Sequence, residues 1–306
     1  MRKSIALATV ALVLAIRAGA QTPAVETRTA NGLHVATFRL PQGSVTVNVP
    51  ADASAGDTIS GTVVAAPAGE TPQQRETNQS DLSGFVVDWQ GQPASVPQGR
   101  YRWTIPVAAR SGSIALVLRN RDGRAISQAA VPVSPFPASP DAPSSAPFEL
   151  PIDGQVGQPA IIRGQTDGTL PPVDITVGTE RADVLAVSPR QIVFRVPEAG
   201  SGVLPLRVTR GGQMQDGSMR VLRIRLTATG TPLQLMKPGQ KATVTMTADG
   251  LQGITQPVTL TIVNANVDVV QLQGGPTQII EIEPRDVRSD ANRPRLSYWY
   301  ATVFPA

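Results

Sequence analysis

The side chains that could carry out catalysis are few in this chain. It has one histidine, His34, and no cysteine. A hydrolase of the Ser-His-Asp type needs a histidine base, and cysteine nucleophiles and Cys/His zinc sites need thiols. His34 lies in LHVATF, ahead of the first expected domain, where no partner acid or nucleophile is prescribed. We therefore expect it on a partly ordered arm and predict no catalytic chemistry that depends on it.

Carboxylates could still act in pairs, as in a glycosidase, where two carboxyl groups lie about 5 to 9.5 Å apart across a cleft. The acids here are scattered, and nothing in the sequence requires two of them to meet. Those considered are Asp52, Asp57, Glu70, Glu76, Asp81, Asp88, Asp174, Glu180, Asp183 and Glu198. No D-x-D-x-D-G calcium loop, P-loop or G-x-G-x-x-G segment occurs, so Asp153-Gly154 and Asp167-Gly168 are predicted turns. We expect no enzyme activity, no metal and no cofactor.

Aromatic rings are the remaining candidates for a binding site, because exposed rings often hold sugars and peptides. Only 4% of the residues are aromatic. Tyr101 and Trp103 share one face of an expected strand, and Trp89 ends another. The last expected strand carries three consecutive rings, which alternate between its two faces. The candidate ligand-binding residues are Trp89, Trp103, Tyr298, Trp299 and Tyr300. The favoured alternative is that these rings fill the cores of β-sandwiches.

Short strand-like runs follow one another along the chain, and most alternate apolar and polar side chains. They are residues 43–49, 59–64, 84–89, 114–118, 173–177, 191–196, 204–208, 221–226, 242–247, 258–263 and 296–303. Asp122-Gly123, Asp216-Gly217 and Asp249-Gly250 are predicted hairpin-type turns. Residues 71–82 (TPQQRETNQSDL) are expected to be mainly a surface loop with at most one helical turn. The predicted fold class is all-β, with tandem immunoglobulin-like β-sandwiches after a signal peptide.

The first 20 residues have the pattern of a removable export signal. Arg2 and Lys3 form a positive start, residues 5–16 an apolar stretch, and Ala18-Gly19-Ala20 a small-residue cleavage site. The apolar stretch is too short to span a bilayer, and no later segment approaches about 20 apolar residues. We expect an exported protein, periplasmic or secreted, with no integral membrane segment after processing. Without cysteine it has neither disulfides nor a lipidated cysteine.

Removal of the leader also changes the charge balance. The 27 basic residues minus Arg2, Lys3 and Arg17 leave 24 against 23 acidic ones, so the basic pI no longer indicates an acidic partner. The nearest approach to a basic patch is Arg220, Arg223 and Arg225. Since the last two alternate with apolar residues, they have the pattern of the solvated face of a strand. We expect no nucleic-acid partner.

Composition divides the chain into a signal peptide (1–20), an N-terminal arm (21–40) and three sandwich units. Residues 135–147 (PFPASPDAPSSAP) are a predicted semi-rigid spacer, because nothing in them could build a core. The spacer separates a first sandwich, 41–134, from a C-terminal half that is long for one sandwich of about 100 residues. We divide that half into 148–226 and 227–306, next to the TATGT segment.

Residues 148–226 contain motifs of a known domain family. They are Ile161-Ile162-Arg163-Gly164, Ile175-Thr176-Val177-Gly178, Val196-Pro197 and residues 202–208. This order of an I-x-G strand, a V-x-V-G hairpin, a strand ending in V-P and a G-x-x-x-(V/L)-x-V segment resembles the IPT/TIG domain. That family has an immunoglobulin-like fold and occurs in bacterial surface proteins. The sequence departs from it at Gln165-Thr166-Asp167, where an aromatic residue is common. The resemblance implies a fold and an exported protein, but no ligand.

Two classes of function remain open. The first is a noncatalytic extracytoplasmic binding or structural protein that holds a cell-envelope or surface partner through loops or strand edges. The second is a carbohydrate-binding module or an accessory protein of a polysaccharide-active system, which the resemblance implies by analogy alone. The expected partner is accordingly an extracellular or envelope protein, or a surface polysaccharide.

Overall fold

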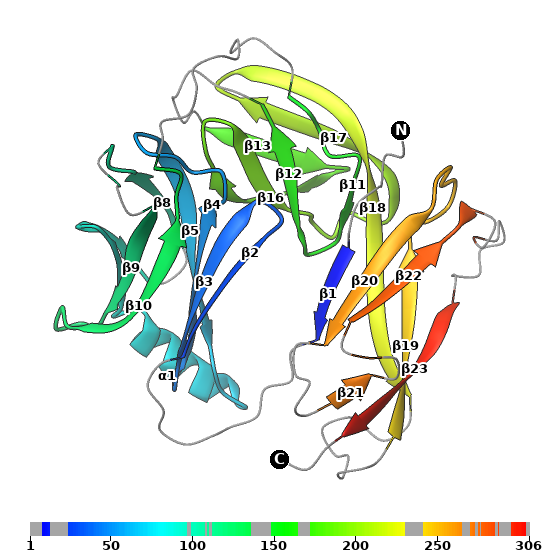
Figure 1. Cartoon of the computed structure of the whole chain (residues 1–306), viewed down its shortest axis with the longest axis horizontal. Coiled ribbons are helices and arrows are strands. Elements are labelled where there is room, and N and C mark those ends of the chain that lie inside the picture. Colours follow the sequence, from blue (N-terminus) through cyan, green and yellow to red (C-terminus); the bar gives the residue numbers. More distant parts are fainter. Residues whose placement is uncertain are drawn as a thin grey trace.

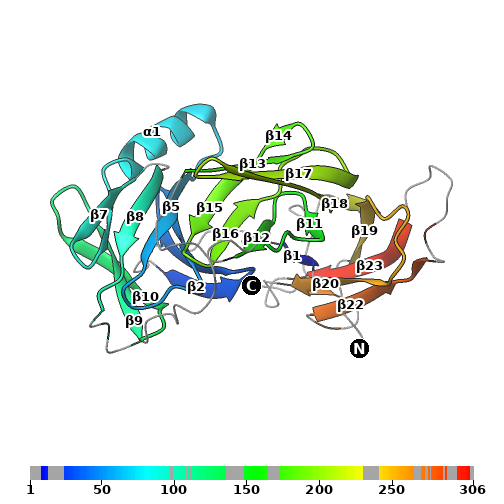
Figure 2. The same ribbon diagram turned by 90° about the horizontal axis from the view of Figure 1, so that it is seen from above.

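A computed structural model describes residues 8–12, 24–96, 99–107, 109, 112–135, 148–164, 172–229, 241–264, 270–272, 275, 277–284, 287 and 295–303. Within them the fold is all-β, with one helix, and consists of immunoglobulin-like β-sandwich units (Figure 1). The units follow one another along the longest axis of the molecule (Figure 2). The predicted fold class is confirmed, and each expected strand run overlaps an observed strand.

The first unit is a sandwich of two antiparallel sheets. One has the order β10-β9-β6-β7, and the other runs β2-β3-β4-β5 with β8 on the far side of β5. The bounds are β2 Val25–Ala30, β3 Leu33–Leu40, β4 Gly43–Pro50, β5 Thr58–Pro67, β6 Val86–Trp89, β7 Gln92–Ser95, β8 Gly99–Thr104, β9 Ser113–Arg119 and β10 Ala125–Pro132. On β9 the apolar Ile114, Leu116 and Leu118 are buried at every second position, as the pleat of a strand requires.

The predicted N-terminal arm is wrong for residues 25–40, which form β2 and β3 of the first unit. Phe38 of β3 pairs with Val45 of β4 and is fully buried in the core. A strand of this kind is stabilised by its neighbour and by the opposite sheet, so the short segment gains its burial only from the assembled sandwich.

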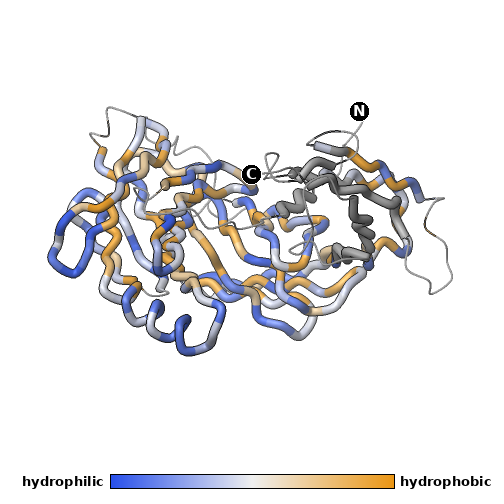
Figure 3. The backbone as a smooth tube through the Cα atoms, turned by 90° about the horizontal axis from the view of Figure 1, so that it is seen from below, coloured by the Kyte–Doolittle hydropathy of each residue, from blue (hydrophilic) through white to orange (hydrophobic). Residues whose placement is uncertain are grey.

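Pro72–Leu82 form α1, so the predicted loop is replaced by an 11-residue helix. Its start is a capping box, because Thr71 Oγ1 accepts from the Gln74 backbone N–H while Gln74 Oε1 accepts from the Thr71 N–H, each at 3.2 Å. Pro72 has the φ angle that a first helical turn needs. Only Leu82 of α1 is buried, and the blue colour of the helix in Figure 3 marks its residues as mainly hydrophilic.

The second unit packs strands β12, β16 and β15 against β14, β13, β17 and β18, with β11 beside β18. The bounds are β11 Asp153–Gln155, β12 Pro159–Arg163, β13 Val173–Val177, β14 Glu180–Arg181, β15 Asp183–Val187, β16 Gln191–Arg195, β17 Gly202–Arg210 and β18 Gln213–Thr229. Ile162, Ile175 and Phe194 are fully buried between the two layers.

Two turns of this unit differ from the sequence prediction. The hairpin between β17 and β18 turns at Gly211-Gly212, whose positive φ angles of 55° and 87° suit glycine. Asp216-Gly217 lies inside β18 instead, where Asp216 forms an ion pair with Arg207 of β17 at 2.7 Å. Asp153-Gly154 begins β11 and is not a turn either, while Asp167-Gly168 lies outside the described residues.

The first two units are packed against each other rather than joined only by a spacer. Val187 of β15 pairs with Ser60 of β5, which links strands of both units into one eight-stranded sheet. Beside this pair, Leu33 and Val35 of β3 belong to one buried apolar cluster with Val193 and other side chains of the second unit. The spacer itself, from residue 136 on, lies outside the described residues.

β18 continues from the second unit into the third, where residues 223–229 pair with β19 (Figure 1). One sheet there has the order β18-β19-β23-β21 and another the order β1-β20-β22. The bounds are β1 Ala8–Leu12, β19 Lys241–Asp249, β20 Val258–Asn264, β21 Val270–Leu272, β22 Thr277–Ile282 and β23 Arg295–Val303. The expected boundary at residues 226 and 227 falls inside β18, so the two units share this strand, and their division stays a prediction.

β1 belongs to the expected signal peptide. It runs parallel to β20, with Ala8 opposite Leu260. Cleavage after Ala20 stays a prediction, and the cleavage site lies outside the described residues. In the part of the chain that the structure describes, no helix combines the length and apolar character needed to cross a membrane.

Candidate functional site

Two of the candidate ligand-binding rings, Trp89 and Trp103, lie in the core of the first unit. Their exposed fractions are 0% and 1%, and their rings stack with centroids 5.2 Å apart. Gly61 of β5 leaves room for this pair, since a Cβ at this position would lie 2.6 Å from the Trp103 ring. These two residues follow the favoured alternative, in which the rings fill a core, and neither can touch a ligand in this structure.

The other three candidates, Tyr298, Trp299 and Tyr300, lie on β23. This strand pairs with β19 at all three rings, and with β21 only at residues 301–303, beyond them. The three side chains themselves lie outside the part of the chain that the structure describes. Their assignment as ligand-binding residues therefore stays a proposal.

His34 lies on β3 and not on an arm. Its Nδ1 is 2.7 Å from Thr29 Oγ1. Burial lowers the pKa of the imidazole below its ordinary value of 6.5, and a hydrogen bond with the Ala51 backbone opposes this shift. His34 lines a hollow of about 140 Å³ together with Arg28 and Val131, and none of the described residues that line it is a carboxylate. The described lining therefore offers the ring the Thr29 hydroxyl as a partner but no acid of the kind that completes a catalytic triad.

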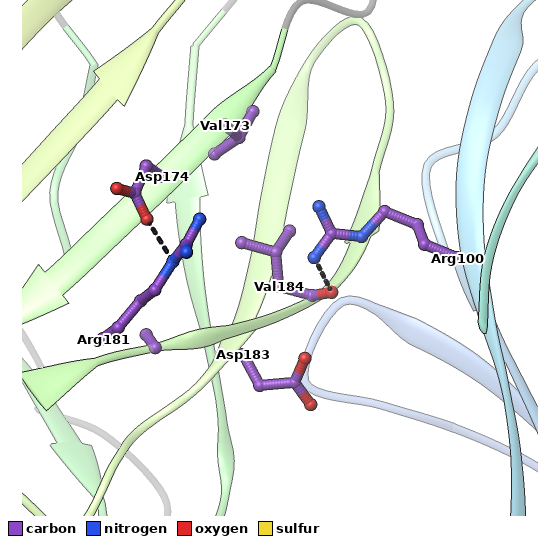
Figure 4. Close-up of a pocket in the computed structure, with 7 residues that line it drawn as sticks. Arg100, Val173, Asp174, Arg181, Asp183 and Val184 are labelled. Atoms are coloured by element: carbon purple, nitrogen blue, oxygen red, sulfur yellow. Dashed lines mark hydrogen bonds and ion pairs between the residues drawn. The ribbon is translucent and has the colours of Figure 1, made fainter. Parts of the chain in front are cut away.

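A larger hollow, of about 330 Å³, opens where the first unit meets the second (Figure 4). We call it the junction pocket. Its lining residues are Arg100, Val173, Asp174, Arg181, Ala182, Asp183 and Val184. Arg100 comes from β8 of the first unit, and the others come from strands β13 to β15 of the second or lie between them. The volume lies at the lower end of the range of about 300 to 1,000 Å³ that is usual for small-ligand sites.

Strand alternation determines which side chains reach the pocket from β13. Val173, Ile175 and Val177 are buried in the second unit, so Asp174 points to the outer face of the strand. Arg181 of β14 lies beside it, with Nε 2.7 Å from Asp174 Oδ1. The two side chains form one wall of the pocket (Figure 4).

Among the described residues, the charged side chains of the junction pocket other than Arg100 have ion-pair partners. Asp174 has Arg181 as its partner, and Asp183 Oδ2 lies 3.9 Å from Arg195 Nη1. Arg100 Nη2 donates to the backbone oxygen of Val184 at 2.9 Å. Among the described residues no carboxylate lies within ion-pair distance of Arg100. Within the part of the chain that the structure describes, Arg100 is therefore a guanidinium of the pocket that has no ion-pair partner.

Elsewhere along the junction, a polar network around Arg190 joins the two units. Arg190 Nη2 donates to Asp57 Oδ2 at 2.6 Å, to Ser54 Oγ at 3.1 Å and to the backbone oxygen of Asp52. Ser188 Oγ donates to Asp52 Oδ2 at 2.8 Å. Asp52 and Asp57 thus meet around a guanidinium, and not across a cleft of the kind a glycosidase needs.

Burial dominates the titration of Asp52 in this network. It raises the pKa of the Asp52 carboxyl, while the hydrogen bond from Ser188 and the charge of Arg190 oppose the shift. Gln191 adds a further contact across the junction, because its Nε2 donates to the backbone oxygen of Gly32 at 2.8 Å. The junction is therefore held by directional contacts as well as by apolar packing.

Three other acids considered from the sequence, Glu76, Asp81 and Asp88, lie in the first unit and do not line the junction pocket. Asp88 of β6 pairs with Arg119 at 2.9 Å, and Glu76 and Asp81 lie on α1. Within the described ranges, no three His, Cys, Asp or Glu side chains gather in a way that could hold a metal ion.

Sequence reasoning missed the three arginines that define the junction, Arg100, Arg181 and Arg190. The alternation of Arg100, Tyr101 and Arg102 does indicate a charged outer face of β8. Nothing in the sequence indicates that Arg100 reaches Val184, which lies 84 positions further along the chain.

A scan against protein families finds no match, and neither does a comparison with curated proteins. Among solved structures, the chain is similar to SGBP-B of a mixed-linkage glucan utilization locus of Bacteroides ovatus, with 12% identity over 83% of this chain and 73% of that one, at a TM-score of 0.22. It is also similar to SGBP-B from a xyloglucan utilization locus of Bacteroides uniformis, with 12% identity over 92% of this chain and 94% of that one, at a TM-score of 0.25. The D1–D4 fragment of ICAM-5 has 14% identity over 89% of this chain and 83% of that one, at a TM-score of 0.21. At TM-scores this low, the likenesses carry no functional argument.

Proposed function

We propose that this chain is a noncatalytic extracytoplasmic binding protein that holds a cell-envelope or surface partner at its junction pocket. The observation that carries the proposal is that both units line the pocket, while Val187–Ser60 pairing and the Arg190 network hold these units together. A site built on the strands of two packed sandwiches is organised before the partner arrives. Binding then costs little ordering of the protein.

The carboxylates of the pocket support binding rather than turnover. Asp174 and Asp183 each have an arginine partner, Arg181 and Arg195 respectively. A catalytic carboxylate must instead be aimed at the bond that breaks, as a proton donor or as a nucleophile. In the proposed role these side chains shape the wall and accept hydrogen bonds from the partner.

We also propose export and an IPT/TIG-like second unit. The positive start, apolar stretch and small-residue site of residues 1–20 support export. The four quoted motifs fall on β12, β13, the end of β16 and β17, an order that agrees with the family pattern. N-terminal sequencing of the protein recovered from the periplasm of an expression host should begin at Gln21, and a chain that still begins at Met1 would contradict the proposed processing.

The proposed function is tested by sedimentation of the exported protein with an isolated cell-envelope fraction. We expect saturable retention that is at least tenfold weaker in the double variant Asp174→Ala/Arg181→Ala. The matched control is Asp216→Ala/Arg207→Ala, which removes an exposed ion pair of the same 2.7 Å length on the same sheet but outside the pocket. Retention that does not saturate, or that both variants reduce equally, would contradict a specific site at the junction.

A second candidate function is a carbohydrate-binding module or an accessory protein of a polysaccharide-active system. The specific observation in its favour is the pocket lining, which offers carboxylate oxygens to sugar hydroxyls beside a guanidinium. Trp299 of β23 is the other proposed contact. Loss of sugar binding in Trp299→Ala without loss of folding would favour a second sugar contact there, and unchanged binding would remove Trp299 from the proposal.

A further inference from the structure

We propose that the junction pocket recognises a uronate residue, meaning a sugar ring that bears a carboxylate, and that Arg100 binds this carboxylate. The inference rests on the proposed function and deepens it, because it names the chemical class of the partner as an acidic surface polysaccharide. It assigns to Arg100 the choice of acidic over neutral sugars. It assigns to the two aspartates of the pocket the recognition of the ring hydroxyls.

Arg100 has the donors and the charge for this role. A guanidinium carries five N–H donors, and the hydrogen bond of Arg100 to the Val184 backbone oxygen uses only Nη2. That contact holds the side chain across the junction without neutralising it. A carboxylate can accept two parallel hydrogen bonds from a guanidinium, which is the strongest arrangement available to such a pair. The position of Arg100 on β8, at a strand rather than on a loop, keeps the donor fixed.

The other lining residues favour a sugar over an acidic peptide. Asp174 and Asp183 present carboxylate oxygens, which accept hydrogen bonds from hydroxyl groups. A run of glutamates or aspartates has no hydroxyl groups and could offer only its backbone N–H groups to these two acceptors. A uronate satisfies both kinds of group, since it carries hydroxyl donors on the ring and one acid.

The size and the remaining walls of the pocket fit one residue of a polymer. Its volume of about 330 Å³ lies at the lower end of the small-ligand range. Val173, Ala182 and Val184 close the pocket on the side of the second unit, to whose core they belong, and each is at most 8% exposed. Neighbouring residues of the polymer would continue outside the pocket, where Arg102 follows on the same face of β8.

The test is calorimetric titration of the exported protein with trigalacturonate, with its fully methyl-esterified form, and with a neutral trisaccharide of glucose. We expect the free acid to bind, the ester and the neutral sugar to bind at least tenfold more weakly, and affinity for the acid to fall as salt is raised. Arg100→Gln should weaken binding of the acid roughly tenfold to a hundredfold, as expected for loss of a charged hydrogen-bonded pair. The control Arg207→Gln, on the outer face of the second unit, should bind as the wild type does.

Three results would overturn the inference: no binding of trigalacturonate at millimolar concentration, equal binding of acid and ester, or pentaglutamate binding as tightly as the sugar acid. If Arg100→Gln does not fold, the comparison of acid with ester on the wild-type protein still decides the matter. Envelope retention that depends on Asp174 and Arg181, combined with no binding of trigalacturonate, would reject the uronate while leaving the proposed binding function in place. Trigalacturonate binding without envelope retention would reject the proposed envelope-binding function while leaving uronate recognition in place.

Discussion

Arg190 and Asp57 form an ion pair across the junction, with Nη2 2.6 Å from Oδ2, although 133 positions separate them in the chain. Their side chains are only 26% and 11% exposed. The Ser54 hydroxyl and the Asp52 backbone oxygen accept further hydrogen bonds from the same guanidinium. Because a charge taken out of water is costly unless it is paired, this arrangement favours one orientation of the two units over others.

Replacement of Arg190 by alanine should therefore lower the free energy of unfolding by about 3 kcal/mol, since it leaves Asp57 buried without its cation. Urea denaturation measures the change. The matched control is Arg39→Ala, whose partner Glu26 lies 2.9 Å away but is 61% exposed. That variant should cost less than about 1 kcal/mol, as surface ion pairs do. Equal losses in the two variants would show that burial of the junction pair has no energetic consequence.

His34 should make stability depend on pH below neutrality. Burial holds its pKa below 6.5 in the folded protein, so between that value and 6.5 the unfolded chain binds more protons than the folded one. The contribution of neutral His34 is thus present above 6.5 and is lost as the pH falls through the folded pKa. His34→Gln should remove this part of the pH dependence in urea titrations.

An NMR titration gives an independent measurement for the same residue, because the chain has only this one histidine. The ring resonances should have a midpoint below 6.5. A midpoint at or above 6.5 would contradict the burial that the structure assigns to this side chain.

Thr71→Ala should destabilise α1 by about 1 kcal/mol, because it removes the oxygen that accepts from the Gln74 N–H. Hydrogen exchange of the helix amides measures the loss. Thr77 provides the control, since its exposed side chain lies within the helix and makes no cap. Thr77→Ala should be neutral or slightly stabilising, because alanine has the higher helix propensity. Protection that is unchanged in Thr71→Ala would show that the cap is not what holds the helix start.

Trp103→Ala should cost about 3 to 5 kcal/mol of folding free energy, because it opens a cavity beside the buried Trp89 ring. Per folded molecule, its retention on the envelope fraction should equal that of the wild type. Thermal unfolding and sedimentation together check both statements. If Trp103→Ala unfolds as the wild type does but is no longer retained on the envelope fraction, Trp103 would again be a candidate ligand contact.

The strand positions follow from the sequence because alternation is a local property. Residues 173–177 are predicted and observed as one strand, β13, since an apolar side chain at every second position matches the two faces of a sheet. The start of helix α1 could also have been predicted from the sequence. Thr71 and Gln74 have the spacing of a capping box. Because Leu82 is the one buried side chain of α1, the segment has no periodic apolar pattern that would indicate a helix.

Pairing partners were decided by tertiary structure. Asp216-Gly217 has the composition of a turn, yet the hairpin closed at Gly211-Gly212, because that register places Asp216 opposite Arg207 and aligns β17 with β18. Residues 25–40 looked like an arm, yet β3 is fixed by its neighbour β4 and by the core beneath Phe38.

By itself the sequence determined the all-β class, the approximate strands and the scarcity of groups able to catalyse a reaction. The tertiary structure alone decided the junction pocket, because Arg100 and Val184 meet only after two separate sandwiches have packed together. Local patterns report which face of a strand is buried, since that depends on neighbours within a few residues. They carry no information on which distant surface comes to rest on that face, and the candidate site lies at such a contact.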